Sequence, residues 1–149
     1  MAKAWTQQGS ARTFYGIEFL EEKPKSLVIC EGEMDVLALA TVGIVAISIP
    51  NGAPSKVSNR KVHPEEDIKF TYLWQERELL ESVDKIVLAT DDDPAGAALA
   101  EELARRIPDG RAKCWRVHYP RGCKDSNDVL IKHGPDRLKE CIENPTPLP

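Results

Sequence analysis

The chain of 149 residues suits one globular domain with a hydrophobic core, because 42% of its residues are hydrophobic and 30% are charged. Its formal net charge of −4 excludes nucleic-acid binding through a general excess of positive charge, although a local basic patch stays possible. No uncharged apolar stretch reaches the roughly 18 residues that span a bilayer, and the first residues lack the apolar segment of a signal peptide. We therefore expect an intracellular protein without a membrane partner.

The first part of the chain and its last residues have the composition of flanking segments. Residues 1–25 are mixed and end in a charged run, which predicts a loosely structured N-terminal approach segment. The Pro-rich residues 144–149 have the composition of a tail. The folded domain is therefore expected to span residues 26–143.

Between these segments, apolar runs alternate with helical patterns. The expected strands are residues 27–30, 44–49, 85–90 and 112–119. The expected helices are a first one that ends at Gly43, then residues 69–83 and 94–107, and short helices to about residue 143. This order predicts an α/β fold of compact Rossmann type, with about four mainly parallel strands and helices on both faces.

Two acidic segments come directly after predicted strands. Glu-Gly-Glu-Met-Asp occupies residues 31–35, and Asp-Asp-Asp-Pro-Ala-Gly occupies residues 91–96. Both should lie at the carboxyl edge of the parallel sheet, where open α/β sheets bind their ligands. Carboxylates that converge there repel one another unless a proton or a divalent cation intervenes, so the pattern predicts Mg²⁺ and phosphate chemistry.

Each acidic segment also has a purely structural interpretation. Asp91 and Asp93 are two residues apart, so both side chains can reach one ion or two neighbouring ions, while Gly96 permits close approach of the backbone. The same aspartates could instead cap the helix that starts next to them. Glu31 would lie at the end of its strand, with Gly32 allowing a phosphate to approach closely, or it could simply precede a helix whose first turn is acidic.

Two basic segments are further candidates. Lys124 and Asp125 follow the fourth predicted strand, where the amine could meet a triphosphate and the carboxylate could complete a metal shell; the alternative is a solvated turn. Lys56, Arg60 and Lys61 follow the second strand and could track a nucleic-acid backbone, and of these Lys56 is the best candidate. A solvated charged loop is the alternative there.

Other common sites find no support in the chain. The four cysteines contain no Cys-x-x-Cys pair, and the three histidines match no ligand or triad spacing. The phosphate-binding loop G-x-x-x-x-G-K-[ST] of ATP-driven motors does not occur either.

The ordered motifs resemble the Toprim domain, the metal-binding core shared by primases and topoisomerases. They are Glu-Gly-Glu-x-Asp at residues 31–35, Thr-Asp-x-Asp-x-x-Gly at residues 90–96, and Lys-Asp-x-Asn-Asp at residues 124–128. Residues 49–58 and 72–74 are most similar to the primase half of Twinkle-type and phage primase-helicases, above all the plant organellar form. The resemblance covers residues 14–149.

This resemblance implies a nucleotidyltransferase that uses Mg²⁺, or alternatively Mn²⁺, to join ribonucleoside triphosphates into a primer on single-stranded DNA. It implies metal-holding roles for Glu31, Asp91, Asp93 and Asp125, and nucleotide or nucleic-acid contacts for Lys56, Lys124, Gly32 and Gly96. A replisome helicase or polymerase would be a partner, and the location would be mitochondrial or plastid. The zinc-binding module, most of the basic lobe and the helicase of such primases do not occur in this chain. A non-catalytic DNA- or partner-binding Toprim module, or a nuclease or topoisomerase fragment, therefore stays open.

Overall fold

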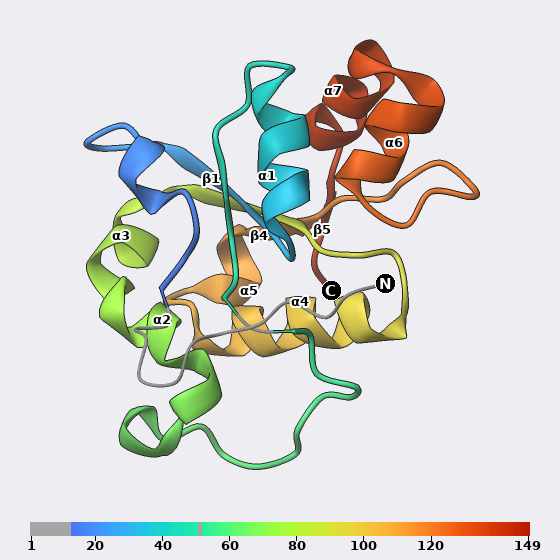
Figure 1. Ribbon diagram of the computed structural model, residues 1–149. Coiled ribbons are helices and arrows are strands. Elements are labelled where there is room, and N and C mark those ends of the chain that lie inside the picture. Colours follow the sequence, from blue (N-terminus) through green and yellow to red (C-terminus); the bar gives the residue numbers. More distant parts are fainter. Residues whose placement is uncertain (1–12, 51) are drawn as a thin grey trace.

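A single five-stranded sheet organises the computed structural model, which describes residues 13–50 and 52–149 (Figure 1). The order across the sheet is β2-β1-β3-β4-β5; the first four strands are parallel, and β5 is antiparallel to β4. The strands are β1 (Ser26–Cys30), β2 (Ala46–Ser48), β3 (Lys85–Ala89), β4 (Cys114–Arg116) and β5 (Thr146–Pro147). The α/β class and the mainly parallel sheet are confirmed.

Successive residues of the two central strands point to opposite faces of the sheet. Strand β1 pairs with β3 in register from Ser26 opposite Lys85 to Cys30 opposite Ala89. Leu27 and Ile29 enter one core cluster, whereas Val28 and Cys30 enter the other. Because both faces are buried, these strands are continuous apolar runs, as is usual in parallel sheets that helices cover on both sides.

One face of the sheet is covered by α1, α6 and α7, drawn above the sheet in Figure 1. Helix α1 (Glu33–Ala40) contributes buried side chains such as Leu39, and α6 (Ser126–His133) contributes Val129. Helix α7 (Pro135–Glu143) adds Leu138 and Ile142. Together with the strand residues that point to this face, these side chains form one of the two core clusters.

The opposite face is covered mainly by α4 (Pro94–Arg106), which buries Leu99 and Leu103 against the strands (Figure 1). The neighbouring elements of this second layer are short. They are η1 (Ile17–Phe19), η2 (Pro64–Glu66), η3 (Ile68–Phe70), α2 (Thr71–Gln75), α3 (Arg77–Ser82) and α5 (Gly110–Lys113). Helix α4 matches the helix expected at residues 94–107, because Pro94 starts it and Asp93 caps it.

Both flanking segments take part in the fold within the described residues. Residues 146–148, expected in a tail, pair with β4, and the buried Leu148 donates its N–H to Cys114. Phe14 is 2% exposed in the core, and Tyr15 bridges to Ser48. Residues 1–12 of the expected approach segment, and Asn51 in the expected turn after the second strand, lie outside the described residues.

The helix expected at residues 69–83 is instead three short pieces, η3, α2 and α3. The break between α2 and α3 lies at Glu76, whose backbone is not helical. Trp74 donates its indole N–H to Asp67 on one side of the break, while Leu80 is buried in the core on the other. Tertiary contacts on both sides of Glu76 thus outweigh the local helical pattern.

The strand expected at residues 112–119 is shorter, because α5 occupies its beginning. Lys113, at the end of α5, is buried and donates from Nζ to the carbonyl oxygens of Leu80, Glu81 and Val83. These carbonyls belong to the last turn of α3, where a positive charge is stabilising. Lys113 therefore stabilises the end of α3 and does not form part of the strand.

Replacing Gly96 with alanine tests how closely α4 packs against the end of β3. A Cβ at Gly96 would overlap the carbonyl oxygen of Asp91, whereas a Cβ at Gly52 meets nothing within 4 Å. We expect Gly96→Ala to lower the free energy of unfolding by about 3 kcal/mol and Gly52→Ala to change it by less than about 0.5 kcal/mol, as measured by urea denaturation. Equal stability of the two variants would contradict this packing.

Candidate functional site

Three carboxylates meet at the carboxyl edge of the parallel sheet. Asp35, Asp91 and Asp125 each offer an oxygen, and these oxygens all lie within 4.8 Å of one another. Asp91 follows β3, Asp35 lies in the first turn of α1 after β1, and Asp125 precedes α6. Acids that are distant in the sequence therefore converge at this edge, as the motifs predicted.

Asp35 is the member of the cluster that the sequence analysis missed. It was assigned only to the acidic first turn of the helix, yet it is 4% exposed and accepts a hydrogen bond from the Asn127 N–H at 3.0 Å. Along α1 it lies on the same face as the buried Ala38 and Leu39. An acid in phase with the buried face of a helix was the signal that could have identified it.

Glu31 is attached directly to the cluster. Its Oε1 accepts the Asp91 N–H at 2.9 Å, across 60 residues of sequence. This hydrogen bond joins the end of β1 to the end of β3. Glu31 and Asp91 are therefore close, as their expected shared site requires.

Asp93 and Asp125 both cap helices. Asp93 accepts the Gly96 N–H at 2.6 Å at the start of α4, and Asp125 accepts the Asp128 N–H at 2.8 Å at the start of α6. The capping interpretation therefore applies to both. Asp125 nevertheless belongs to the three-carboxylate cluster, whereas Asp93 flanks it.

Lys124 supplies positive charge at the rim of the cluster. Its Nζ lies 3.5 Å from Asp91 and 3.7 Å from Asp93, and its side chain is 57% exposed. The loop that carries it is tied to the other acidic segment, because the Lys124 carbonyl accepts the Asp92 N–H at 2.7 Å. Lys124 thus lies beside the acids and is open to solvent, and its expected contact with a triphosphate stays a prediction.

The two candidate glycines have different surroundings. Gly32 caps α1 with an extended backbone, and a Cβ there would approach only the Asp35 carboxylate, at 3.7 Å. Gly96 is buried, and its lack of a side chain admits the backbone of Asp91. The close approach at Gly96 is therefore internal to the protein, and its expected contact with a ligand stays a prediction.

Burial and mutual repulsion favour the protonated forms of these acids. Burial, followed by the charges of Asp125 and Asp91, raises the pKa of Asp35 to about 7. Burial, together with the charges of Asp91 and Asp93, also raises the pKa of Glu31 to about 7. The pKa of Asp91 is raised mainly by burial and by Asp125, although Lys124 opposes this. The cluster therefore carries negative charge that the described side chains do not fully compensate.

This donor set fits a hard divalent cation. Asp35, Asp91 and Asp125 offer only oxygen ligands, which Mg²⁺ and Mn²⁺ prefer, and their spacing lets all three approach one ion. A cation would relieve the repulsion that helps to raise the pKa values of Asp35 and Asp91. Glu31 and Asp93 lie next to the set and could hold water or a second ion.

Lys56 lies in a different part of the molecule. It is exposed in the loop after β2 and lines a cavity whose other walls come from residues 58–70 and from α4. None of the acids of the cluster lines that cavity. The structure therefore does not bring Lys56 together with the acidic cluster, and its nucleic-acid role stays a prediction.

Comparison with known proteins identifies the family. Residues 28–130 match a protein family described as Toprim-like, which is more than half of the chain. The chain belongs to the Toprim-like family. The resemblance noted in the motifs is confirmed, and the matched range contains every acid of the cluster.

Two curated relatives of this Toprim-like chain are plant proteins. It is 40% identical over 150 residues to the Twinkle homolog protein, chloroplastic/mitochondrial, of Arabidopsis thaliana, an alignment that covers 96% of this chain and 21% of that protein. It is also 40% identical over 157 residues to the Primase homolog protein of Arabidopsis thaliana, covering 100% and 46% of the two. The chain spans less than half the length of either relative.

Solved structures of primases share the fold of the Toprim-like chain. A structure of bacteriophage T7 lagging-strand DNA polymerase interacting with primase domains of two gp4 subunits matches with a TM-score of 0.75 and 22% identity, covering 98% of this chain and 68% of the other. The primase fragment of the bacteriophage T7 primase-helicase matches with a TM-score of 0.60 and 25% identity, covering 79% and 44%. The DnaG primase catalytic domain bound to ssDNA matches at 0.59 and 22%, covering 90% and 39%.

Across residues 13–50 and 52–149 of the Toprim-like chain, no helix has both the length and the apolar character needed to cross a membrane.

The raised pKa values predict that the metal-free protein becomes less stable as pH rises. Glu31 and Asp35 have ordinary pKa values of 4.5 and 3.8 but about 7 in the fold, so the folded state binds more protons than the unfolded state between about pH 4 and 7. The stability present at low pH is therefore lost as the pH rises to about 7, by several kcal/mol, because each pKa unit corresponds to about 1.4 kcal/mol. Thermal unfolding in EDTA from pH 5 to 8 measures this. Saturating Mg²⁺ should flatten the profile, and an equally steep profile with Mg²⁺ would contradict the assignment.

Removing the charge of Asp35 should stabilise the metal-free protein. In Asp35→Asn the amide oxygen can still accept the Asn127 N–H, while a buried charge and its repulsion by Asp91 and Asp125 disappear. We expect a gain of about 1 to 2 kcal/mol in urea unfolding with EDTA, together with weaker Mg²⁺ binding. Asp92→Asn, an exposed aspartate beside the cluster, is the matched control and should change neither quantity. A destabilised Asp35→Asn would show that the carboxylate is needed for the fold.

Proposed function

We propose that this chain is the catalytic core of a DNA primase, which joins ribonucleoside triphosphates into a primer on single-stranded DNA in a reaction that depends on Mg²⁺ or Mn²⁺. The observation that carries the proposal is the meeting of Asp35, Asp91 and Asp125 within 4.8 Å at the carboxyl edge of the sheet. Polymerising sites use such carboxylates to hold the ions that bind phosphate groups.

Asp35, Asp91 and Asp125 would hold the first ion, and Asp93 is placed for a neighbouring one. When bound, the ion would neutralise charge on the carboxylates and on the substrate phosphates and would lower the pKa of the attacking 3′-hydroxyl. The protein contributes rigid placement. Asp91 lies two residues beyond the end of the central strand β3, and Asp125 is held by the start of α6.

Glu31 is suited to exchange a proton near neutral pH. Its pKa of about 7 lies close to the value at which a general base is both deprotonated and basic enough to act. Its Oε1 is occupied by the Asp91 N–H, which orients the carboxylate and leaves Oε2 to face a reacting hydroxyl. The proposed role of Glu31 is therefore proton transfer in addition to metal binding.

Lys124 is the proposed contact for the triphosphate. Its amine is exposed and stands beside the carboxylates, so it can approach the same phosphate group that the ion neutralises. Gly32 would admit a phosphate at the start of α1, where backbone N–H groups are directed outward. A contact of the Gly96 backbone with the nucleotide is also proposed, although this glycine is buried.

The names of the relatives support the proposed setting. One is a Twinkle homolog described as chloroplastic/mitochondrial, and another is a Primase homolog. Solved structures with the same fold include primase domains bound to an RNA/DNA hybrid with a DNA polymerase, and a primase domain bound to ssDNA. We therefore propose work in organellar DNA replication, with single-stranded DNA as template and a helicase or polymerase as partner.

A second candidate is a non-catalytic module that binds DNA or a replication protein. It is favoured by one observation, namely that the exposed Lys56 lies in a part of the molecule that none of the acids of the cluster lines. DNA cleavage through a tyrosine is less well supported. Tyr72 and Tyr119 are buried, and burial raises the pKa of each, which disfavours the tyrosinate nucleophile.

Metal binding and primer synthesis separate these candidates. Manganese binding should be measured by electron paramagnetic resonance for the wild-type chain and for Asp91→Asn with Asp125→Asn. We expect the double variant to bind at least about tenfold more weakly, because two of three charged ligands become neutral. Asp84→Asn with Asp92→Asn, a pair of exposed aspartates outside the cluster, is the control for lost charge.

Primer synthesis is then assayed with ribonucleotides and a single-stranded template, first with this chain and then with the chain joined to the rest of the Primase homolog. Synthesis that needs Mg²⁺ and falls about 100-fold or more in Glu31→Gln is the expected result. Metal binding without any synthesis in either form would favour the module. Indifference to metal would overturn the proposal.

A further inference from the structure

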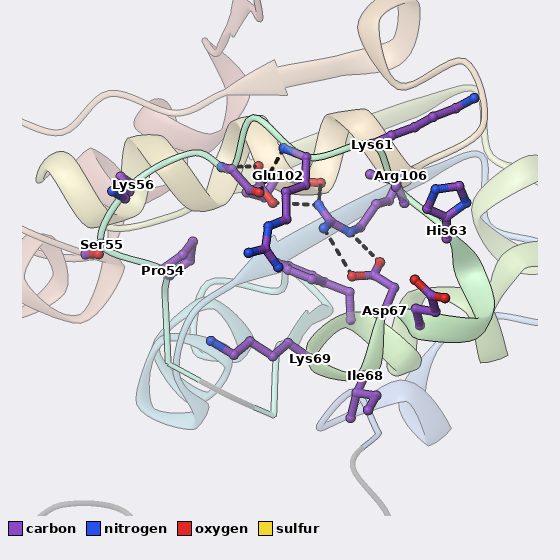
Figure 2. A pocket seen from close by; sticks show the side chains of 15 residues that line it. Pro54, Ser55, Lys56, Lys61, His63, Asp67, Ile68, Lys69, Glu102 and Arg106 are labelled. Carbon is purple, nitrogen blue, oxygen red and sulfur yellow. Dashed lines mark hydrogen bonds and ion pairs between the residues drawn. The ribbon is translucent and has the colours of Figure 1, made fainter.

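A second hollow lies away from the acidic cluster, between α4 and the long loop that follows β2. Its volume is about 530 Å³, within the range of roughly 300–1,000 Å³ for ligand sites. Figure 2 shows the side chains around it, with Lys56 on one side of the opening and Lys61 and His63 on the other. The proposed primase chemistry uses none of this surface except Lys56.

The acids at the base of the hollow are neutralised within the protein. Arg106 donates to Asp67 at 2.6 and 3.1 Å and to Glu102 at 2.8 Å, as the dashed lines in Figure 2 mark. Arg105 donates to the other oxygen of Glu102 at 2.6 Å. The Arg106 guanidinium also stacks over Phe70, 3.8 Å from the ring centroid. Asp67 and Glu102 therefore add little net negative charge to the hollow.

Positive charge remains at the rim. Lys56, Arg60 and Lys61 are exposed, and no acidic side chain among the described residues forms an ion pair with any of them. Glu66 is the one exposed acid that lines the hollow in the described part of the chain. Lys56, Arg60 and Lys61 thus line the hollow together with one exposed carboxylate, and Lys69 is a fourth exposed cation there, on a protein whose overall charge is −4. The surface is locally basic against an acidic background.

The basic loop is held in place by α4. Arg105 donates to the carbonyl oxygens of Ser58 and Arg60 at 2.7 and 2.6 Å, and the Ser58 N–H donates to Glu102 at 3.1 Å. Glu102 is 2% exposed, whereas the two bonds from Arg105 to the loop lie nearer the surface. A loop that was merely solvated would not need a buried carboxylate and two arginines beneath it. The anchor reduces the entropy that the cations lose on binding.

From these observations we infer that the rim of this hollow is a docking surface for the sugar-phosphate backbone of single-stranded nucleic acid. The cations would contact phosphates, while the exposed Ile68 and the partly buried Val62 offer apolar surface to a base. The identity of the strand as template DNA rests on the proposed function. The surface itself does not depend on the metal centre, because no acid of the cluster lines it.

Fluorescence anisotropy with a labelled oligothymidylate of about 16 nucleotides, in EDTA and between about 50 and 200 mM salt, tests the inference. The variant is Lys56→Gln with Arg60→Gln and Lys61→Gln. Its affinity should fall roughly tenfold or more at the lowest salt, and its plot of log affinity against log salt should be shallower by about 2, because each phosphate contact contributes about 0.7 to the slope.

The matched control is Lys25→Gln with Arg77→Gln and Lys139→Gln, which removes the same charge from exposed positions elsewhere. It should keep at least half of the wild-type affinity and the wild-type slope. Circular dichroism and unchanged Mn²⁺ binding establish that both variants are folded. The Mn²⁺ measurement also reports on the proposed function independently of DNA binding.

Three results would overturn the inference. One is a wild-type chain that does not bind the oligonucleotide in EDTA at the lowest salt. Another is an equal loss of affinity in the two triple variants, which would indicate attraction without a defined surface. The third is a folded Lys56, Arg60 and Lys61 variant with wild-type affinity and slope, which would assign the basic loop to a protein partner instead.

Discussion

The site depends on keeping like charges together. Asp35, Asp91 and Asp125 come from three separate segments, and their oxygens approach within 4.8 Å although burial and repulsion raise the pKa of Asp35 and of Asp91. The backbone is what holds them there. Asp91 is fixed by the strand before it and by its N–H bond to Glu31, Asp35 by the Asn127 N–H, and Asp125 by its cap on α6. The stability lost by holding like charges together at this edge is offset by the two apolar layers that enclose the sheet.

The parallel sheet explains why so few residues suffice to build the site. Strands β1 and β3 are adjacent and in register, so both end at the same edge, and the segments that leave them deliver Glu31 and Asp91 side by side. The two acidic loops are then joined by the Asp92 N–H to Lys124 carbonyl bond. Helices start at Glu33, Pro94 and Ser126 immediately afterwards, so their N-termini all face this edge and add favourable positive potential.

The features that sequence predicted well were those set by local pattern. The apolar runs of β1 and β3, the helix that starts at Pro94 and the acids directly after the strands all follow from patterns within a few residues. What escaped prediction depended on distant partners. Asp35 joins the cluster only because α1 turns it toward Asp91 and Asp125. Lys113 belongs to α5 and not to the start of the predicted strand, where its amine meets carbonyl oxygens of α3. Pro147 forms an edge strand, a position where proline is tolerated because it need not donate a hydrogen bond inward.

Helix α4 connects the acidic cluster at one of its ends with the basic loop at the other. Its first residue follows Asp93 beside the acidic cluster. In its last turn, Arg105 donates hydrogen bonds to the basic loop. With 13 residues at about 1.5 Å each, the helix is a rod of about 20 Å. Since its inner face is buried along this whole length, the rod cannot bend or slide without opening the core. It therefore holds the acidic cluster and the basic loop at a fixed separation.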